Sequence, residues 1–156
     1  MFLIELAQAF QKAKIPYALV GGYAVALHGA VRGTVDIDII LKLSKKDYLL
    51  AETTLIKLGL TPRLPIKAEE VFNFRTEYIT NRNLIAWSFM DPKKPQNQLD
   101  IIITENLDDF ETETIRLHGI TLKILSKKSL IKMKRKSGRP QDLEDARALE
   151  NLLNAK

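Results

Sequence analysis

The sequence predicts a mixed α and β fold, in which a central sheet is flanked by helices and followed by a C-terminal helical pair. Short apolar runs at 17–20, 34–41, 84–90 and 99–103 have the length of strands, and 34–41 also alternates between two faces. Stretches with helical spacing separate several of them, and two more fill residues 126–153. With 156 residues, 46% of them apolar, the chain is large enough for one domain over residues 1–156, with its core at about 15–125.

The N-terminal part alternates helices and strands. Residues 2–13 carry four apolar side chains at helical spacing, Leu3, Leu6, Ala7 and Phe10. We expect this helix to end near Pro16 and a buried strand to occupy 17–20. Gly21-Gly22 then breaks the strand, and a short Ala-rich helix runs to Gly29.

The middle of the chain gives fewer signals. Ser44, with Asp47 three residues later, predicts the capped start of a helix over about 45–58. Residues 59–83 hold glycine, prolines and mixed polar residues, and only "VFNF" indicates a short helix. The strands 84–90 and 99–103 are then expected to pair as a hairpin with a long connection.

The C-terminal part predicts strands around a turn at His118-Gly119, followed by two helices. The first helix, about 126–137, is capped by Ser126. The second, about 140–153, begins with Pro140 at a favoured first-turn position.

Composition excludes several kinds of site. The chain has no cysteine, so disulfides and thiolate chemistry are excluded, and its two histidines cannot build a zinc site alone. No stretch approaches the ~20 apolar residues of a membrane span, and polar residues interrupt the N-terminal apolar run, so there is no signal-peptide core. We therefore expect a soluble, cytoplasmic protein with no membrane partner.

The basic residues are concentrated near the C-terminus. The net charge is +5, yet residues 123–139 alone hold eight Lys or Arg and no acid, which leaves 16 basic and 19 acidic residues elsewhere. Such a block is often a solvated helix face, and the alternative is a surface for a phosphate-rich partner. Both interpretations stay open on the sequence alone.

Two aspartates interrupt the apolar strand 34–41. Because Asp36 and Asp38 are two residues apart, their side chains share a face and their Cα atoms lie roughly 6.5 to 7 Å apart. Desolvation and repulsion would force one of them to take a proton unless a cation is present. Carboxylates suit Mg²⁺ or Mn²⁺, which keep positions open for substrate phosphates. If the strand carrying Asp100 lies alongside, three carboxylates surround one or two metal ions, as in phosphoryl or nucleotidyl displacement.

Gly21-Gly22 lies 15 residues upstream of Asp36-x-Asp38, at a strand-to-helix turn. Glycines at such a turn let a phosphate approach the backbone, and the helix start offers unpaired N–H groups. Neither the P-loop pattern nor the G-x-G-x-x-G fingerprint is present, so this turn belongs to another class of phosphate site.

Together these motifs resemble those of the DNA polymerase β-type nucleotidyltransferase superfamily, whose signature is a G-G or G-S turn followed by D-x-D and a third acid. The matching residues are Gly21-Gly22, the short Ala-rich helix, Arg32-x-Thr34-x-Asp36-x-Asp38 and Asp100. The string "LIKMKRKSGRPQDLEDARAL", with Lys134, Arg139, Asp142 and Asp145, is similar to the tail of small bacterial proteins related to the AbiEii toxin group and to an uncharacterised family of similar length. The resemblance covers about residues 17–41, 98–103 and 126–153.

The resemblance implies a twisted, mixed sheet flanked by helices, with a nucleoside triphosphate such as ATP lying across the glycine turn. It implies that Asp36, Asp38 and Asp100 are catalytic and hold Mg²⁺ or Mn²⁺, with Asp100 also helping to activate the acceptor hydroxyl. The predicted nucleotide-binding residues are Gly21, Gly22, Arg32 and Lys134. Members transfer a nucleoside monophosphate to RNA, protein or small molecules such as antibiotics, and several belong to toxin–antitoxin systems. The resemblance therefore implies a toxin–antitoxin partner, and the small size of the chain for a transferase favours a partner or a homodimer that completes the acceptor site.

Three residues have a second interpretation. Arg32 either contacts a triphosphate oxygen or pairs with Asp36. Lys134 is interpreted either as a phosphate ligand or as a structural residue. In the structural interpretation, Lys134 or Arg139 pairs with Asp142 and fixes the helical pair against the sheet. His28, at the end of an apolar helix, is interpreted as a packed or capping residue rather than a base.

Two functions from different classes remain. The first is a Mg²⁺-dependent nucleotidyltransferase that moves NMP from an NTP to a hydroxyl on RNA, such as tRNA, or on protein. The alternative is a non-catalytic module of the same fold that binds nucleic acid or a partner protein through residues 123–139. Such a module would bind nucleic acid without metal, and its affinity would fall steeply as the salt concentration rises. The complete set of three acids favours the enzyme.

Overall fold

The computed structural model describes residues 1–30, 33 and 36–155. Within these residues one sheet of seven strands runs through the molecule in the order β3-β4-β5-β2-β1-β7-β6. The strands are β1 (Tyr17–Val20), β2 (Ile37–Leu41), β3 (Thr61–Pro62), β4 (Ala86–Met90), β5 (Gln98–Ile102), β6 (Thr112–Leu117) and β7 (Ile120–Leu125). Since β2 is antiparallel to β1 and parallel to β5, the sheet is mixed.

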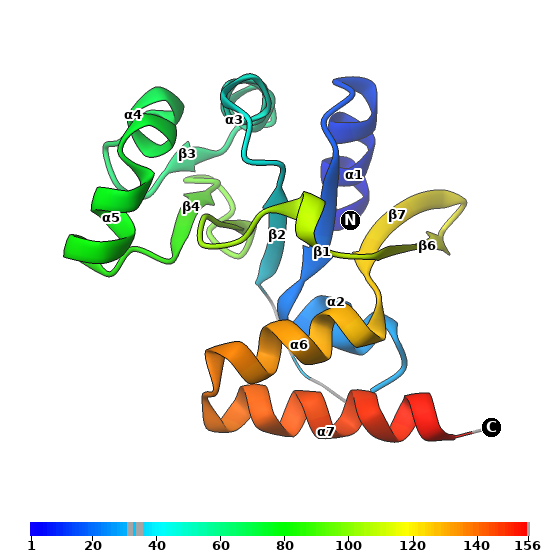
Figure 1. Cartoon of the computed structure of the whole chain (residues 1–156). Helices are drawn as coiled ribbons and strands as arrows, with labels where there is room; N and C mark the ends of the chain where they lie inside the picture. The colour runs from blue at the N-terminus through cyan, green and yellow to red at the C-terminus, as the bar shows by residue number, and fades with distance from the viewer. Residues whose placement is uncertain (31–32, 34–35, 156) are drawn as a thin grey trace.

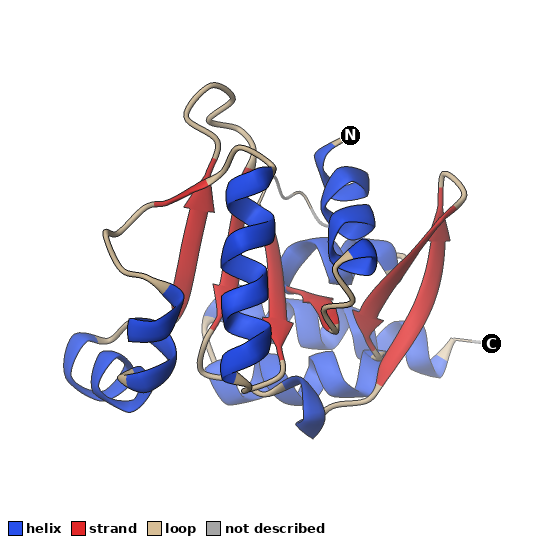
Figure 2. Cartoon of the chain, turned by 90° about the horizontal axis from the view of Figure 1, so that it is seen from above, coloured by secondary structure: helices blue, strands red, loops and turns tan. Residues whose placement is uncertain are grey.

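Helices cover both faces of this sheet (Figures 1 and 2). The helices are α1 (Phe2–Lys12), α2 (Gly21–Leu27), α3 (Lys45–Lys57), α4 (Ala68–Asn73), α5 (Arg75–Arg82), α6 (Lys127–Ser137) and α7 (Pro140–Asn154), with a 3₁₀ turn η1 at Leu107–Asp109. α1, α3 and α4 lie above the sheet in Figure 1, and α2, α6 and α7 lie below it. No described helix is both long and apolar enough to cross a membrane. The predicted mixed fold with a C-terminal helical pair is confirmed.

Local chemistry explains where several elements begin. The Ser44 hydroxyl accepts a hydrogen bond from the Asp47 backbone N–H at 3.3 Å and caps α3, and Ser126 accepts one from the Ser129 N–H at 3.1 Å and caps α6. Pro140 opens α7 as expected. The turn between β6 and β7 falls at His118-Gly119, where both residues have positive φ.

Alternation along the central strands separates two faces. In β4 and β5 every second residue is buried, including Trp87 and Ile101, which are partners across the two strands. The Trp87 ring stacks on Tyr48 of α3 with ring centroids 5.9 Å apart and planes 6° apart. The face bearing Trp87 and Ile101 therefore packs against α3, and the intervening residues lie on the opposite face.

One prediction about the elements was wrong, and one helix was not predicted. β2 begins at Ile37, so Asp36 precedes the strand that was expected to carry it, and residues 34–35 of the predicted strand lie outside the described residues. The segment 75–82, which gave no sequence signal, forms α5. No residue of α5 is fully buried, and Tyr78 and Ile79 are its only apolar side chains, so the segment has too few apolar positions for a helix to be predicted.

Candidate active site

Asp38 and Asp100 are Cα partners on the parallel neighbours β2 and β5. Val20 of β1 is the partner of Asp38, and Ser88 of β4 is the partner of Asp100. Paired residues project to the same face of a sheet, so these four side chains form one row, which we call the acid row. The row lies on the opposite face from Trp87, toward α6 and α7.

The two carboxyl groups of the acid row interact strongly. Burial raises the pKa of Asp38 to about 7, and the charges of Asp100 and Asp36 together with a hydrogen bond to Asp100 act in the same direction. The positive charge of Lys134 opposes this rise. Near neutral pH, Asp38 therefore carries a proton for about half of the time when no cation is bound.

Asp36 contributes to the same electrostatic site from outside the strand. Its side chain is exposed, and the alternation that was expected to place it on the Asp38 face does not apply, because β2 starts one residue later. Its charge nevertheless raises the pKa of Asp38, so it lies near the acid row. The structure thus pairs Asp38 with Asp100, and Asp36 acts on this pair through its charge from outside the strand.

Gly21 makes room for Asp38. It has a φ of +68°, and a Cβ built on it would overlap Asp38 Oδ2 and lie 2.9 Å from Asp38 Cγ. Only glycine satisfies both conditions, since an L side chain at this position would be strained and would collide with the carboxylate. Gly22 follows, buried in the first turn of α2. The glycine pair is therefore tied sterically to the acid row.

Lys134 of α6 is buried and held by two acids of α7. Its Nζ lies 2.9 Å from Asp145 Oδ2 and 3.5 Å from Asp142 Oδ1. Arg139 Nε donates to Asp142 Oδ2 at 2.8 Å. Burial alone would raise the pKa of Asp142, but the hydrogen bond from Arg139 and the charge of Lys134 hold it below its ordinary value. Pairing of Lys134 and of Arg139 with Asp142 is thus present, and Lys134 also acts on Asp38.

Much of the basic segment 123–139 is neutralised by acids of the same molecule. Besides Lys134 and Arg139, Arg135 pairs with Glu150, and Lys136 Nζ lies 3.2 Å from the buried Glu105 carboxylate. Half of the eight basic residues of this segment are therefore in ion pairs. A surface reserved for phosphates would leave more of these charges open.

Arg32, the remaining predicted nucleotide-binding residue, lies outside the described residues. His28 Nε2 lies 2.7 Å from the Leu125 carbonyl oxygen, and its side chain is 4% exposed. This confirms the interpretation of His28 as a packed residue.

The acid row fits a hard divalent cation by its donor chemistry. Asp38 and Asp100 offer carboxylate oxygens, and a cation between them would relieve the repulsion that raises the pKa of Asp38. Over the described residues, no group of three or more His, Asp or Glu side chains forms a preset metal cage. Mg²⁺ is usually bound by one or two carboxylates plus substrate phosphates, so a facing pair is the expected arrangement for it.

Sequence reasoning missed Ser88. It falls in a strand that was predicted, and the pairing of that strand with 99–103 was predicted too. The register that places Ser88 beside Asp100 depends on a connection over residues 91–97, whose length does not fix the pairing. The alternation of "AWSFM" was the available signal, because it separates Ser88 from the buried Trp87 and Phe89.

Comparison with known proteins bears on the fold. No protein-family model matches the sequence, and no curated protein matches it either. Several solved structures are similar. An antigenic nucleotidyltransferase-like protein from Paracoccidioides brasiliensis has a TM-score of 0.61 and 16% identity, with 97% of this chain and 74% of that chain covered.

Two antibiotic-modifying proteins are similar to the same extent. The antibiotic-resistance factor ANT(2″)-Ia has a TM-score of 0.64 at 13% identity, covering 97% of this chain and 82% of that one. The lincosamide antibiotic adenylyltransferase LnuA, bound to lincomycin, has a TM-score of 0.62 at 14% identity, covering 97% and 96%. At these identities the likeness concerns the backbone architecture. The chain has the mixed α and β fold of the nucleotidyltransferases.

Proposed function

We propose that this chain is a divalent-metal-dependent nucleotidyltransferase that transfers NMP from an NTP to an acceptor hydroxyl. The observation that carries the proposal is the acid row, where Asp38 and Asp100 face each other in register beside Gly21. Burial beside other acids makes Asp38 harder to ionise, so this arrangement does not stabilise the fold by itself. Such a cluster of acids is typical of a site that binds a cation and a polyphosphate. The fold shared with nucleotidyltransferases supports the same proposal.

In the proposed reaction the acceptor oxygen attacks the α-phosphorus of the NTP, the bond from that phosphorus to the bridging oxygen breaks, and pyrophosphate leaves. Asp38 and Asp100, with Asp36 beside them, would hold Mg²⁺ or Mn²⁺, which when bound neutralises the charge that develops on the phosphates. Asp100 would receive the proton of the acceptor hydroxyl. Gly21 and Gly22 would let the triphosphate approach the backbone, and Lys134 would add positive charge beside it.

The acceptor belongs to the proposal as well. RNA such as tRNA and protein hydroxyls are the acceptors that the sequence resemblance favours, within a toxin–antitoxin pair related to the AbiEii group. Small hydroxylated antibiotics are a further class, because one similar structure is ANT(2″)-Ia in complex with adenylyl-2″-tobramycin and another is LnuA with lincomycin. The non-catalytic module is disfavoured by the internal ion pairs of segment 123–139.

The test is transfer of label from each α-³²P-labelled NTP, with Mg²⁺ or Mn²⁺, to total tRNA, to a cell-protein extract and to a panel of lincosamides and aminoglycosides. We expect a metal-dependent labelled product with one acceptor class, lost in Asp38→Asn and kept in Asp109→Asn, which removes an exposed acid of η1 instead. Absence of metal-dependent NTP binding and of pyrophosphate release with every acceptor would contradict the proposal. Salt-sensitive RNA binding without metal, unchanged in Asp38→Asn, would favour the module.

A further inference from the structure

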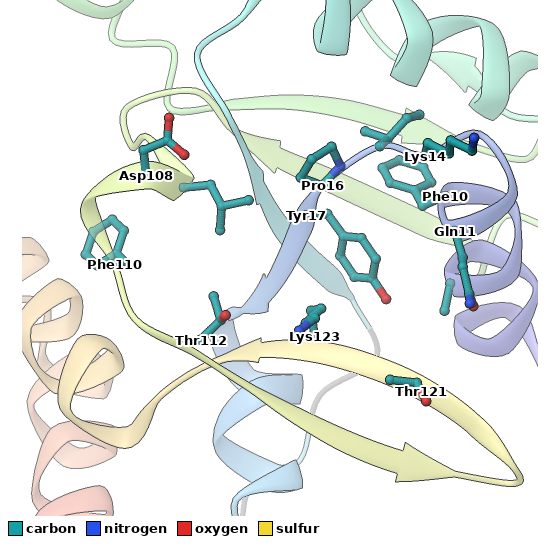
Figure 3. A pocket seen from close by; sticks show the side chains of 13 residues that line it. Phe10, Gln11, Lys14, Pro16, Tyr17, Asp108, Phe110, Thr112, Thr121 and Lys123 are labelled. Atoms are coloured by element: carbon teal, nitrogen blue, oxygen red, sulfur yellow. The ribbon is translucent and has the colours of Figure 1, made fainter.

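A pocket of about 550 Å³ lies at the other end of β1 from the acid row. Tyr17, the first residue of β1, lines it, whereas Val20 at the last position belongs to the acid row. Figure 3 shows α1 and the turn after it on one side, the segment 107–110 on the other, and the β6–β7 hairpin below. The volume is typical of a site for a small molecule rather than of a packing defect.

The pocket offers aromatic surface. Phe10 and Tyr17 meet edge to face, with centroids 5.5 Å apart and planes 83° apart, and Phe110 lines the opposite side. Burial raises the pKa of Tyr17, so its hydroxyl stays neutral and able to donate near neutral pH. Aromatic rings arranged around a cavity favour a flat, apolar ligand body.

The pocket also offers positive charge. Lys14 and Lys123 both line it, and across the described part of the chain neither lies within ion-pair distance of a carboxylate. Lys123 Nζ instead donates to the Thr114 hydroxyl at 3.1 Å. The one acid of the lining, Asp108, lies 3.8 Å from Lys42. The charge that a ligand would meet is therefore positive.

We propose that this pocket is a second ligand site, which binds a small anion with an aromatic body. The rings would contact Tyr17 and Phe110, behind which the buried Phe10 packs on Tyr17, and the anionic group would face Lys14 and Lys123. This site does not depend on the proposed transferase activity, since it shares no residue with the acid row.

A matched pair of fluorescent probes tests the proposal on the full-length protein. 8-Anilinonaphthalene-1-sulfonate carries a sulfonate, and N-phenyl-1-naphthylamine has the same rings without it. We expect saturable one-to-one binding of the sulfonate. The double variant Lys14→Gln, Lys123→Gln should weaken it about ten-fold and leave the uncharged probe unaffected, since two charge contacts are lost.

The control double variant is Lys127→Gln, Lys132→Gln, which lowers the net charge equally from two α6 positions outside the pocket. It should bind the sulfonate as the original protein does. Thr121→Phe, which fills the pocket from the exposed face of β7, should weaken both probes, and its unchanged melting temperature would exclude misfolding. Equal weakening by the two lysine pairs, or undiminished binding in Thr121→Phe, would overturn the site.

Discussion

Asp38 and Asp100 share a hydrogen bond although both are carboxyl groups, because parallel pairing of β2 and β5 fixes them side by side. Asp38 therefore tends to keep a proton near neutral pH that a carboxyl group in water would have lost. The consequences of that proton can be measured without knowing the acceptor.

Stability of the metal-free protein should fall as pH rises from about 4 to above 7. The pKa of Asp38 is raised from 3.8 in the unfolded reference to about 7 in the folded protein, so the folded state binds the proton more tightly. The contribution of Asp38 protonation to the free energy of unfolding is fully present below pH ~4 and is lost as the pH rises past ~7. Urea unfolding at pH 5.5 and 8.5 checks it, with Asp38→Asn as the variant whose dependence should flatten.

Millimolar Mg²⁺ should raise the melting temperature more at pH 8.5 than at pH 5.5. A cation bound beside Asp38 and Asp100 requires the ionised form of Asp38, so it competes with the Asp38 proton at lower pH. Ca²⁺ and Na⁺ at the same ionic strength are the controls. An equal rise at both pH values, or in Asp100→Asn, would place the cation elsewhere.

Gly21→Ala should lower the proposed transfer activity at least ~100-fold, because the new methyl group displaces the Asp38 carboxylate. It should also lower the free energy of unfolding by about 1 to 3 kcal/mol, because a side chain at this positive φ strains the backbone. Gly119→Ala is the matched control. Gly119 also has positive φ, +77°, but nothing lies within 4 Å of its added Cβ. It should show the backbone strain alone, with activity retained.

Lys134→Met should cost about 3 to 5 kcal/mol, because it leaves Asp142 and Asp145 buried without the cation between them. It should also raise the pKa of Asp38 further, since the charge of Lys134 lowers it. Chemical denaturation over a pH series measures both effects. Lys132→Met, two positions earlier on the exposed side of α6, should change neither.

Tyr48→Phe should stabilise the protein by about 1 kcal/mol. The Tyr48 hydroxyl is buried without a hydrogen-bond partner in the described structure, and burial raises the pKa of Tyr48 to about 12. The stack on Trp87 does not need the hydroxyl and should persist. A rise in urea midpoint at constant slope, with unchanged Trp87 fluorescence, is the expected result; a lower midpoint would mean that the hydroxyl is satisfied in solution.

Much of the fold could be predicted because its signals are local. The caps Ser44 and Ser126, the turn at His118-Gly119 and Pro140 each act within a few residues of themselves. α5 could not be predicted, because a helix with no fully buried residue leaves only a weak apolar pattern in the sequence.

The candidate site was predictable in its residue types and less so in its geometry. The sequence motif predicted that Asp38, Asp100 and the glycine pair lie together, and the structure places Asp38 beside both Asp100 and Gly21. Three features depend on pairing between distant parts of the chain: the position of Asp36 before β2, the register of Ser88, and the ion pair of Asp145 with Lys134. A periodic pattern in the sequence carries no information on such pairing.

The parallel neighbours β2 and β5 are separated in sequence by the segment from α3 to β4. This segment forms the outer strands β3 and β4 at one edge of the sheet, and the chain then returns to the centre as β5 (Figure 1). Insertions or exchanges within this excursion would leave both ends of the Asp38–Asp100 pair where they are. The border of the sheet formed by β3 and β4 could therefore vary in length and sequence while the Asp38–Asp100 pairing keeps its geometry.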